Sequence, residues 1–380
     1  MRRLSVGIVF LALLTATAVK ATPTQPHVAP APPSACAPPA LGFGAGEGRN
    51  DVDMPPTVGD LRIAMLFVDF SDSPAGVAPQ RVYDAHVPRV LDWYRTVSYG
   101  RLRIAVQPFP RWIRLPRTLE EYQRERFEGA IQAALAAADP EFDFGSFNAL
   151  YVIASMPSLA STIIDDVPLR VDGTAIHSWA WLATGSLERL PLVLIHETGH
   201  LLGLPDLYID GSTSSQHVWD VMTAAKTGGM FAWHRWKLGW LDDDQITCLT
   251  RRGTIETTLT PVEQPGGKKV LISRVGKAVL VVEARRTVAE DASLCRAGVL
   301  FYRVDFAAGA PENAGLPGTP IQLRPARRDD GRQRARCGSE WRAPFRLGVG
   351  QVSRATAWRH QLTVVRALRD GAYRVRLTRR

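Results

Sequence analysis

Apolar positions in the first two thirds of the chain form two patterns, short continuous runs and runs with helical spacing. Continuous runs of strand length, such as LRIAMLFVDF, are typical of buried strands. Strands are predicted at residues 61–70, 98–106, 149–155 and 174–182. Helices are predicted at residues 81–97, at 118–140 after a capping signal at Thr118, and from Pro191 onwards.

Beyond Trp240 the pattern changes to short β-branched segments that are separated by turn residues. These segments are 268–275, 278–286, 298–306, 360–368 and 372–377. They predict a β-rich domain at residues 244–380, with the form of a small sandwich, after a domain of helices and strands at residues 60–243. The fold class predicted for the whole chain is therefore α+β.

The first 59 residues differ from the rest of the chain. Residues 1–21 combine two arginines, a short apolar run and small residues, which is the layout of a secretory signal peptide. Residues 22–59 are rich in Pro, Ala and Gly and are interpreted as a linker or short pro-segment. No later apolar run is as long, so we expect a secreted, extracellular protein with no transmembrane segment in the mature chain. A retained anchor is the alternative.

The formal net charge of +9 is unevenly distributed. Residues 321–380 hold sixteen Arg against four Asp and Glu, whereas residues 22–320 are net acidic. The basic segment could contact an anionic cell surface. The alternative is compositional, because the chain uses 40 Arg and six Lys and Arg then fills ordinary solvent-facing positions. No specific nucleic-acid partner is predicted.

The chain has four cysteines, an even number that is typical of disulfides in an exported protein. They are Cys36, Cys248, Cys295 and Cys337, which can form two disulfides in any of three pairings. The absence of a CxxC motif argues against a zinc site built from thiolates. Cys36 lies in the Pro/Ala-rich stretch, where a tethering disulfide is one interpretation and a thiolate that caps a metal in a latent precursor is the other.

The chemistry is concentrated in the stretch HETGH. His196 and His200 are four residues apart, so on a helix their imidazoles face the same way and can bind one metal ion. A catalytic zinc needs three protein ligands and a fourth position for water, whose pKa the ion lowers. Glu197 is the predicted catalytic residue, which accepts a proton from the attacking water and passes it to the leaving amine.

The residues after HETGH supply the third predicted ligand. Gly203 allows a sharp turn at the end of the helix, without which Asp206 would continue along the helix axis. With the turn, Asp206 can return to the metal as an oxygen ligand, and the pattern becomes HExxHxxGxxD. Met222 follows at a distance that suits a methionine turn beneath the ion, although core filler is the ordinary role of a Met. One catalytic Zn²⁺ is the predicted cofactor.

Other polar residues near the motif are weaker candidates. Tyr208 and His217 could donate a hydrogen bond to a developing oxyanion, or could be a packed aromatic and a surface histidine. His177 could bind a peptide along a sheet edge or have a structural role. Residues 210–211, with Asp206, could form a Ca²⁺ loop, but their spacing does not match an EF-hand and an ordinary turn is favoured.

The chain resembles the immune-inhibitor-A type of secreted bacterial metallopeptidases. The resemblance rests on motifs that are separated along the chain and covers roughly residues 61–306. These motifs are SYGRLRI at 98–104, HETGHLLGLPDLY at 196–208, WDVMTA at 219–224, FAWHRWKLGWL at 231–241, and VVEARR with GVLFYRVD between residues 281 and 305. His234, within the fourth motif, is interpreted as a core residue.

The resemblance implies a zinc endopeptidase of metzincin-like architecture that acts on proteins or peptides. Its fold would be a twisted mixed sheet over an active-site helix, with a cleft and a methionine turn. On the matching positions His196, His200 and Asp206 are the ligands, Glu197 is the base and Met222 forms the turn. The N-terminal region is shorter than in larger members and leaves little room for a folded propeptide.

The alternative function is a non-catalytic surface-binding protein that keeps the peptidase fold. Such a protein would act through its basic β-rich C-terminal domain, with zinc structural or absent. Glu197 beside both histidines argues against it, because a binding protein has no need of a general base.

Overall fold

A computed structural model describes most of the chain. The described residues are 25–40, 46–48, 54–125, 127, 129–157, 160–207, 218–223, 228–306, 320–324, 326 and 353–380. The predicted signal peptide and Cys337 therefore lie outside the described residues. Within the described ranges, no helix is both long enough and apolar enough to cross a membrane.

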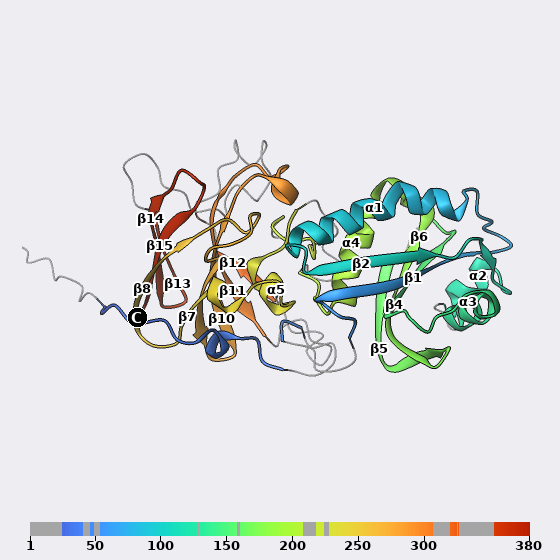
Figure 1. Cartoon of the computed structure of the whole chain (residues 1–380), viewed down its shortest axis with the longest axis horizontal. Coiled ribbons are helices and arrows are strands. Elements are labelled where there is room, and N and C mark those ends of the chain that lie inside the picture. The colour runs from blue at the N-terminus through green and yellow to red at the C-terminus, as the bar shows by residue number, and fades with distance from the viewer. Residues whose placement is uncertain are drawn as a thin grey trace, which may run out of the picture.

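The first half of the described chain is built on a mixed sheet (Figure 1). Its strands are β1 (Gly59–Asp69), β2 (Leu102–Pro108), β3 (Ile113–Arg114), β4 (Ala149–Ala154), β5 (Ala160–Val171) and β6 (Thr174–Ala183). The strand order is β2-β1-β4-β6-β5, and β3 pairs with the C-terminal end of β1. Neighbouring strands are parallel except at the edge, where β5 runs antiparallel to β6.

Helices cover both faces of this sheet. They are α1 (Pro79–Val97), α2 (Leu119–Arg124), α3 (Ala130–Ala138) and α4 (Leu190–Leu201). Side chains alternate between the faces of a strand. Odd-numbered residues 61–67 of β1 pack with α1 and α4, whereas even-numbered residues 64–68 pack with α2 and α3. The sheet is thus the middle of three layers, which explains why its central strands β1 and β4 are nearly continuous apolar runs in the sequence.

The second half of the described chain is rich in strands. They are β7 (Ile246–Leu249), β8 (Gly253–Leu259), β9 (Val270–Val275), β10 (Ala278–Arg285), β11 (Gly298–Asp305), β12 (Ile321–Leu323), β13 (Ser353–Ala357), β14 (His360–Ala367) and β15 (Tyr373–Arg379). They form one sheet in the order β12-β11-β10-β9-β7 and another in the order β13-β14-β15-β8. Leu271 and Phe301 of the first share a buried cluster with Leu362 and Val375 of the second. The described chain is α+β, as the sequence predicts.

The helix α5 (Ala232–Lys237) lies between the two halves (Figure 1). The β9–β11 sheet packs its other face, the one turned away from the second β-sheet, against the first half of the chain. Ile272 and Tyr302 on this face belong to the same hydrophobic cluster as α1 and α4. The ring of Phe231, just before α5, lies 4.6 Å from that of Tyr302 between centroids. The two halves therefore share one continuous core. Short 3-10 helices complete the described elements: η1 (Pro33–Cys36), η2 (Asp139–Glu141), η3 (Thr184–Arg189), η4 (Asp243–Gln245) and η5 (Ala289–Asp291).

The single helix predicted for residues 118–140 is wrong, because the chain forms α2 and α3 with a break between them. The predicted start is present, since Thr118 and Glu121 form a capping box. The break occurs where Phe127 and Gly129 have positive φ angles of 62° and 74°. Phe127 packs its ring against Trp181, 5.4 Å away between centroids. A tertiary contact thus accompanies a break that the Ala-rich composition does not indicate.

The described part of the N-terminal segment packs on the protein as an ordered strap. Residues 25–40 run along the β-rich half, with backbone hydrogen bonds to Thr254 and Cys248 (Figure 1). Cys36 is buried and forms a disulfide with Cys248. The hypothesis that Cys36 is a metal-capping thiolate is therefore wrong, because a disulfide sulfur cannot act as a thiolate. Cys295 is also disulfide-bonded.

Loss of the Cys36–Cys248 disulfide is expected to destabilise the fold. The two residues are 212 positions apart, so the bond closes a long loop in the unfolded chain. Chain-entropy arguments predict that Cys36→Ala/Cys248→Ala lowers the free energy of unfolding by about 2–5 kcal/mol. Urea unfolding of the full-length variant measures this change. An unchanged unfolding midpoint would contradict the prediction.

Candidate metal centre

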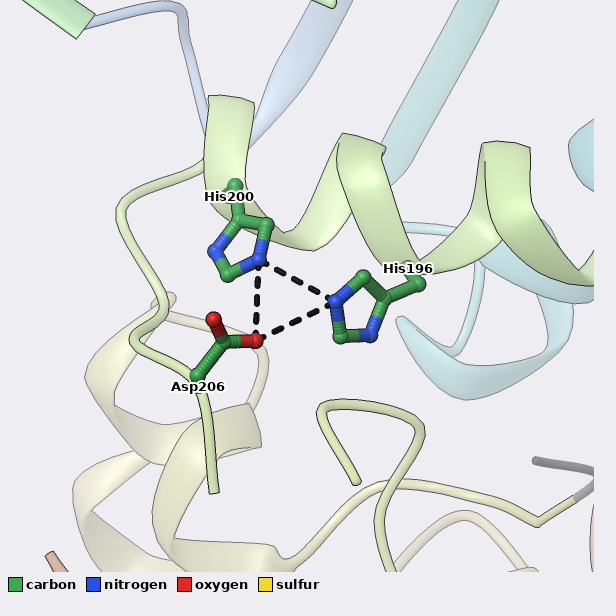
Figure 2. A group of neighbouring side chains, drawn as sticks. All are labelled: His196, His200 and Asp206. Carbon is green, nitrogen blue, oxygen red and sulfur yellow. Dashed lines mark hydrogen bonds and ion pairs between the residues drawn. The ribbon is translucent and has the colours of Figure 1, made fainter. Parts of the chain in front are cut away.

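The helix α4 places the two histidines of HETGH on one face. Pro191 occupies its first turn, where the missing amide proton costs no intrahelical hydrogen bond. Leu194 and Leu201 face the hydrophobic core. Figure 2 shows that His196 and His200 project together from the helix. Their Nε2 atoms are 3.1 Å apart.

Backbone carbonyl groups determine which nitrogen of each ring carries the proton. Nδ1 of His196 lies 3.0 Å from the carbonyl oxygen of Val221, and Nδ1 of His200 lies 2.8 Å from that of Leu204. A carbonyl oxygen can only accept, so each Nδ1 is the donor. In a neutral ring Nε2 then presents a lone pair. Both rings are held in the tautomer that a metal ligand requires.

A sharp turn ends α4, as predicted at Gly203. The amide of Gly203 donates to the carbonyl of His200 at 2.8 Å, and the amide of Leu204 donates to that of Gly199 at 3.0 Å. These two bonds form a Schellman motif, in which the residue at the Gly203 position has a positive φ. Its φ is 86°, a conformation that a residue with a Cβ adopts only with strain. The chain therefore reverses instead of extending the helix.

The reversal brings Asp206 to the two histidines. Its Oδ1 lies 3.2 Å from Nε2 of His196 and 3.2 Å from Nε2 of His200 (Figure 2). Asp206 Oδ1 is buried, and no donor satisfies it among the described residues, as expected if neither Nε2 carries a proton. The Asp206 side chain is 40% exposed whereas that of His196 is 6% exposed, so solvent reaches the cluster from the Asp206 side. These three residues can hold a metal ion.

Electrostatics in this cluster favour a bound cation. Burial alone lowers the pKa of His200, but its close contact with Asp206 and the negative charge of that carboxylate outweigh burial and raise the pKa. Burial likewise raises the pKa of Asp206, yet its contacts with His196 and His200 hold it well below the usual range. The carboxylate thus stays ionised and draws a positive species to the two rings.

Met222 lies directly against the active-site helix. A Cβ placed on Gly199 would be 2.4 Å from Sδ of Met222, so the sulfur packs on the helix backbone between the two histidines. The carbonyl of Met222 accepts a hydrogen bond from the amide of Leu207 at 3.0 Å. This bond joins the turn that holds Met222 to the loop that carries Asp206. The methionine and the third candidate ligand are therefore placed together.

Glu197 is buried on α4, 5% exposed, between the two histidines in sequence. Its negative charge adds to burial in raising the pKa of the Tyr94 hydroxyl, and it also contributes to raising that of His200. The carboxylate therefore lies close enough to the cluster to act electrostatically on it. The structure places a candidate proton acceptor beside a candidate metal site.

The remaining predicted site residues are elsewhere or outside the described residues. His177 lies on β6 and lines a cavity of about 320 Å³ with Met54, Phe147 and Asn148. No member of the described metal cluster lines this cavity. Tyr208, His217 and residues 210–211 fall outside the described residues, so the oxyanion and Ca²⁺ hypotheses stay predictions.

Two residues of the site were missed from the sequence. Gly199 within HETGH received no role from the sequence, although its missing Cβ makes room for Met222. Asp220 is buried and its Oδ1 accepts from the amide of Met222 at 2.9 Å, which stabilises the turn that carries Met222. An Asp two residues before a turn position is a recognised turn signal, so the DVM tripeptide contained the information.

Comparison with known proteins adds little to this geometry. No family model and no curated protein sequence matches the chain. A structural match is the crystal structure of metalloproteinase-II from Bacteroides fragilis, at 14% sequence identity and a TM-score of 0.26. The match covers 48% of this chain and 53% of that one, so the chain spans about half the length of that structure. A likeness of this size carries no argument about function.

Substitution of Gly199 by Ala is expected to destabilise the protein. A Gly→Ala change in a helix ordinarily stabilises by about 1 kcal/mol. Here the new methyl group would meet Met222 Sδ at 2.4 Å, and such overpacking costs about 1–3 kcal/mol. Urea unfolding of Gly199→Ala, Met222→Ala and the double variant measures the coupling. The clash should disappear in the Met222→Ala background, and an equal effect in both backgrounds would contradict the contact.

Proposed function

We propose that the protein is a zinc-dependent endopeptidase. The observation that carries the proposal is the convergence of His196 Nε2, His200 Nε2 and Asp206 Oδ1, each 3.1–3.2 Å from the others. Ligand atoms about 2.0 Å from a central ion in a tetrahedral site are separated by about 3.3 Å. Two imidazoles and one carboxylate form a donor set that suits zinc and leaves one coordination position open.

The residues of the chain divide the chemistry between them. When bound, zinc supplies Lewis-acid chemistry, which acidifies water and polarises a carbonyl group. His196, His200 and Asp206 hold the ion, and the exposed side of Asp206 leaves an approach for water and substrate. Glu197, buried beside the cluster, accepts the proton from the attacking water and delivers it to the leaving amine.

Proteins and peptides are the substrates that we propose. Support comes from the resemblance of residues 61–306 to the immune-inhibitor-A type of metallopeptidases, and from the extended pattern HExxHxxGxxD. The mixed sheet with its antiparallel edge strand, the helix α4 and the packed Met222 are compatible with a metzincin-like architecture. Secretion is part of the proposal, supported by the layout of residues 1–21 and by the disulfide between Cys36 and Cys248.

The isosteric change Glu197→Gln, which removes the carboxylate charge, is expected to slow hydrolysis strongly and keep the metal. Glutamine has the size of the glutamate but cannot accept the proton, so the rate on an unstructured protein should fall at least about 100-fold. Zinc content, measured by elemental analysis, should stay at one ion per chain. His196→Ala is the matched control and should lose both zinc and activity.

Two results would overturn this function. Equal cleavage by the wild type and Glu197→Gln would remove the proposed base, and a wild-type protein without zinc would remove the site. Either result would favour the alternative of a surface-binding protein that acts through its basic C-terminal half. In that half the described Arg374 and Arg376 both pair with Glu256, so part of the basic charge is already neutralised within the protein.

A further inference from the structure

A short piece of the N-terminal segment enters the core beside the metal site. Glu47, between Gly46 and Gly48, is fully buried although it belongs to a Pro/Ala/Gly-rich stretch that was interpreted as a linker or pro-segment. Its Oε2 accepts a hydrogen bond from the indole of Trp233 at 2.9 Å, and its Oε1 lies 3.1 Å from Nε2 of His234. Burial of a carboxylate costs free energy unless it is paired and hydrogen-bonded, as Glu47 is. Glu47 is therefore a specific part of the fold and not a residue of a flexible linker.

From Glu47 one chain of contacts leads to the methionine turn. Nδ1 of His234 lies 2.8 Å from Oδ2 of Asp220. Asp220 in turn accepts from the amides of Met222 and Phe231 at 2.9 and 2.8 Å. Burial lowers the pKa of His234, but the charges of Asp220 and Glu47 outweigh burial and raise it to about 10. A positively charged imidazole is thus held between two buried carboxylates.

A second chain of contacts leads from Gly46 to the turn that returns Asp206 to the metal. Nζ of Lys237 donates to the carbonyl of Gly46 at 2.6 Å and to that of Gly203 at 2.8 Å. Burial lowers the pKa of Lys237 to about 8, and the charge of Glu47 opposes this effect. Lys237 therefore joins the N-terminal segment to the end of α4.

Both connecting side chains come from one short helix. His234 and Lys237 are three residues apart on α5, so they lie on the same side of it. The loops that they reach, at Gly203–Asp206 and at Asp220–Met222, belong to neither a helix nor a strand. Backbone hydrogen bonds fix the first loop at Gly203 and Leu204 and join Leu207 to Met222, and the side-chain contacts of His234 and Lys237 with the two loops add to these bonds.

We propose that Gly46–Glu47 is a positioning clamp for the metal site and remains part of the active protein. The clamp sets the two loops that place Asp206 and Met222 against His196 and His200. It rests on the proposed function in one respect, since its purpose is to order the ligands of a bound zinc ion. Its role is to position other residues, because the described contacts of Glu47 are with Trp233 and His234 and not with the three candidate ligands.

The zinc affinity of full-length Glu47 variants tests the clamp. Loss of a residue that orients metal ligands typically weakens metal binding by about 10–100-fold. Glu47→Ala should therefore raise the zinc dissociation constant by a factor in this range, measured by competition with a chelator. The absorption spectrum of the Co²⁺-loaded protein should also change, because the ligand geometry changes. Glu47→Gln keeps the shape, removes the charge and should give a smaller shift.

A matched control separates positioning from general stability. Cys36→Ala/Cys248→Ala releases the same N-terminal segment at a different anchor and should lower the melting temperature without a comparable change in zinc affinity. The clamp is overturned if Glu47→Ala lowers the melting temperature alone, with zinc affinity and the Co²⁺ spectrum unchanged. It is also overturned if the disulfide variant shows the same loss of zinc affinity.

Hydrogen exchange of the metal-free protein keeps the clamp distinct from the proposed function. In Glu47→Ala, backbone amides of residues 203–207 and 220–222 should exchange faster than in the wild type, while those of β1 should not. If the wild type binds no zinc, the proposed function fails but this comparison still decides the clamp. Unchanged exchange in both loops would contradict it.

Discussion

The site is organised around one constraint: three atoms that each present a lone pair are held close together, and without a cation between them they repel one another. Two imidazole nitrogens and a carboxylate oxygen, from His196, His200 and Asp206, are held 3.1–3.2 Å from one another. The carbonyl groups that accept from each Nδ1 direct both Nε2 lone pairs into the same space. Such an arrangement is stable only if a cation occupies it or a proton is shared within it, so the fold must hold the ligands in place from outside.

The surrounding structure provides that support in layers. Helix α4 fixes the two rings by packing on the sheet, and the Schellman turn at Gly203 returns the chain to them. Met222 fills the space under Gly199, and its backbone joins the loop before Asp206. Behind these contacts, His234 and Lys237 of α5 connect both loops to Gly46–Glu47 of the N-terminal segment. The metal site is therefore held by segments from widely separated parts of the sequence, including one that resembles a linker in composition.

Local signals made much of this predictable. The spacing of HETGH, the turn at Gly203 and the apolar run of β1 each depend on neighbouring residues, so their interpretation from sequence agrees with the described geometry. The break between α2 and α3 depends on a contact between Phe127 and Trp181, which are far apart in the sequence. Glu47 gave no signal at all, because low hydrophobicity conceals a residue whose burial depends on His234 and Trp233.

X-ray absorption at the zinc edge tests the central claim most directly. The full-length protein, loaded with one equivalent of zinc, should show two imidazole nitrogens at about 2.0–2.1 Å and a carboxylate oxygen at about 2.0–2.2 Å. The oxygen contribution should change in Asp206→Ala while the two imidazoles remain. Failure to retain zinc, a sulfur ligand at about 2.3 Å, or a spectrum that Asp206→Ala leaves unchanged would contradict a site built from His196, His200 and Asp206.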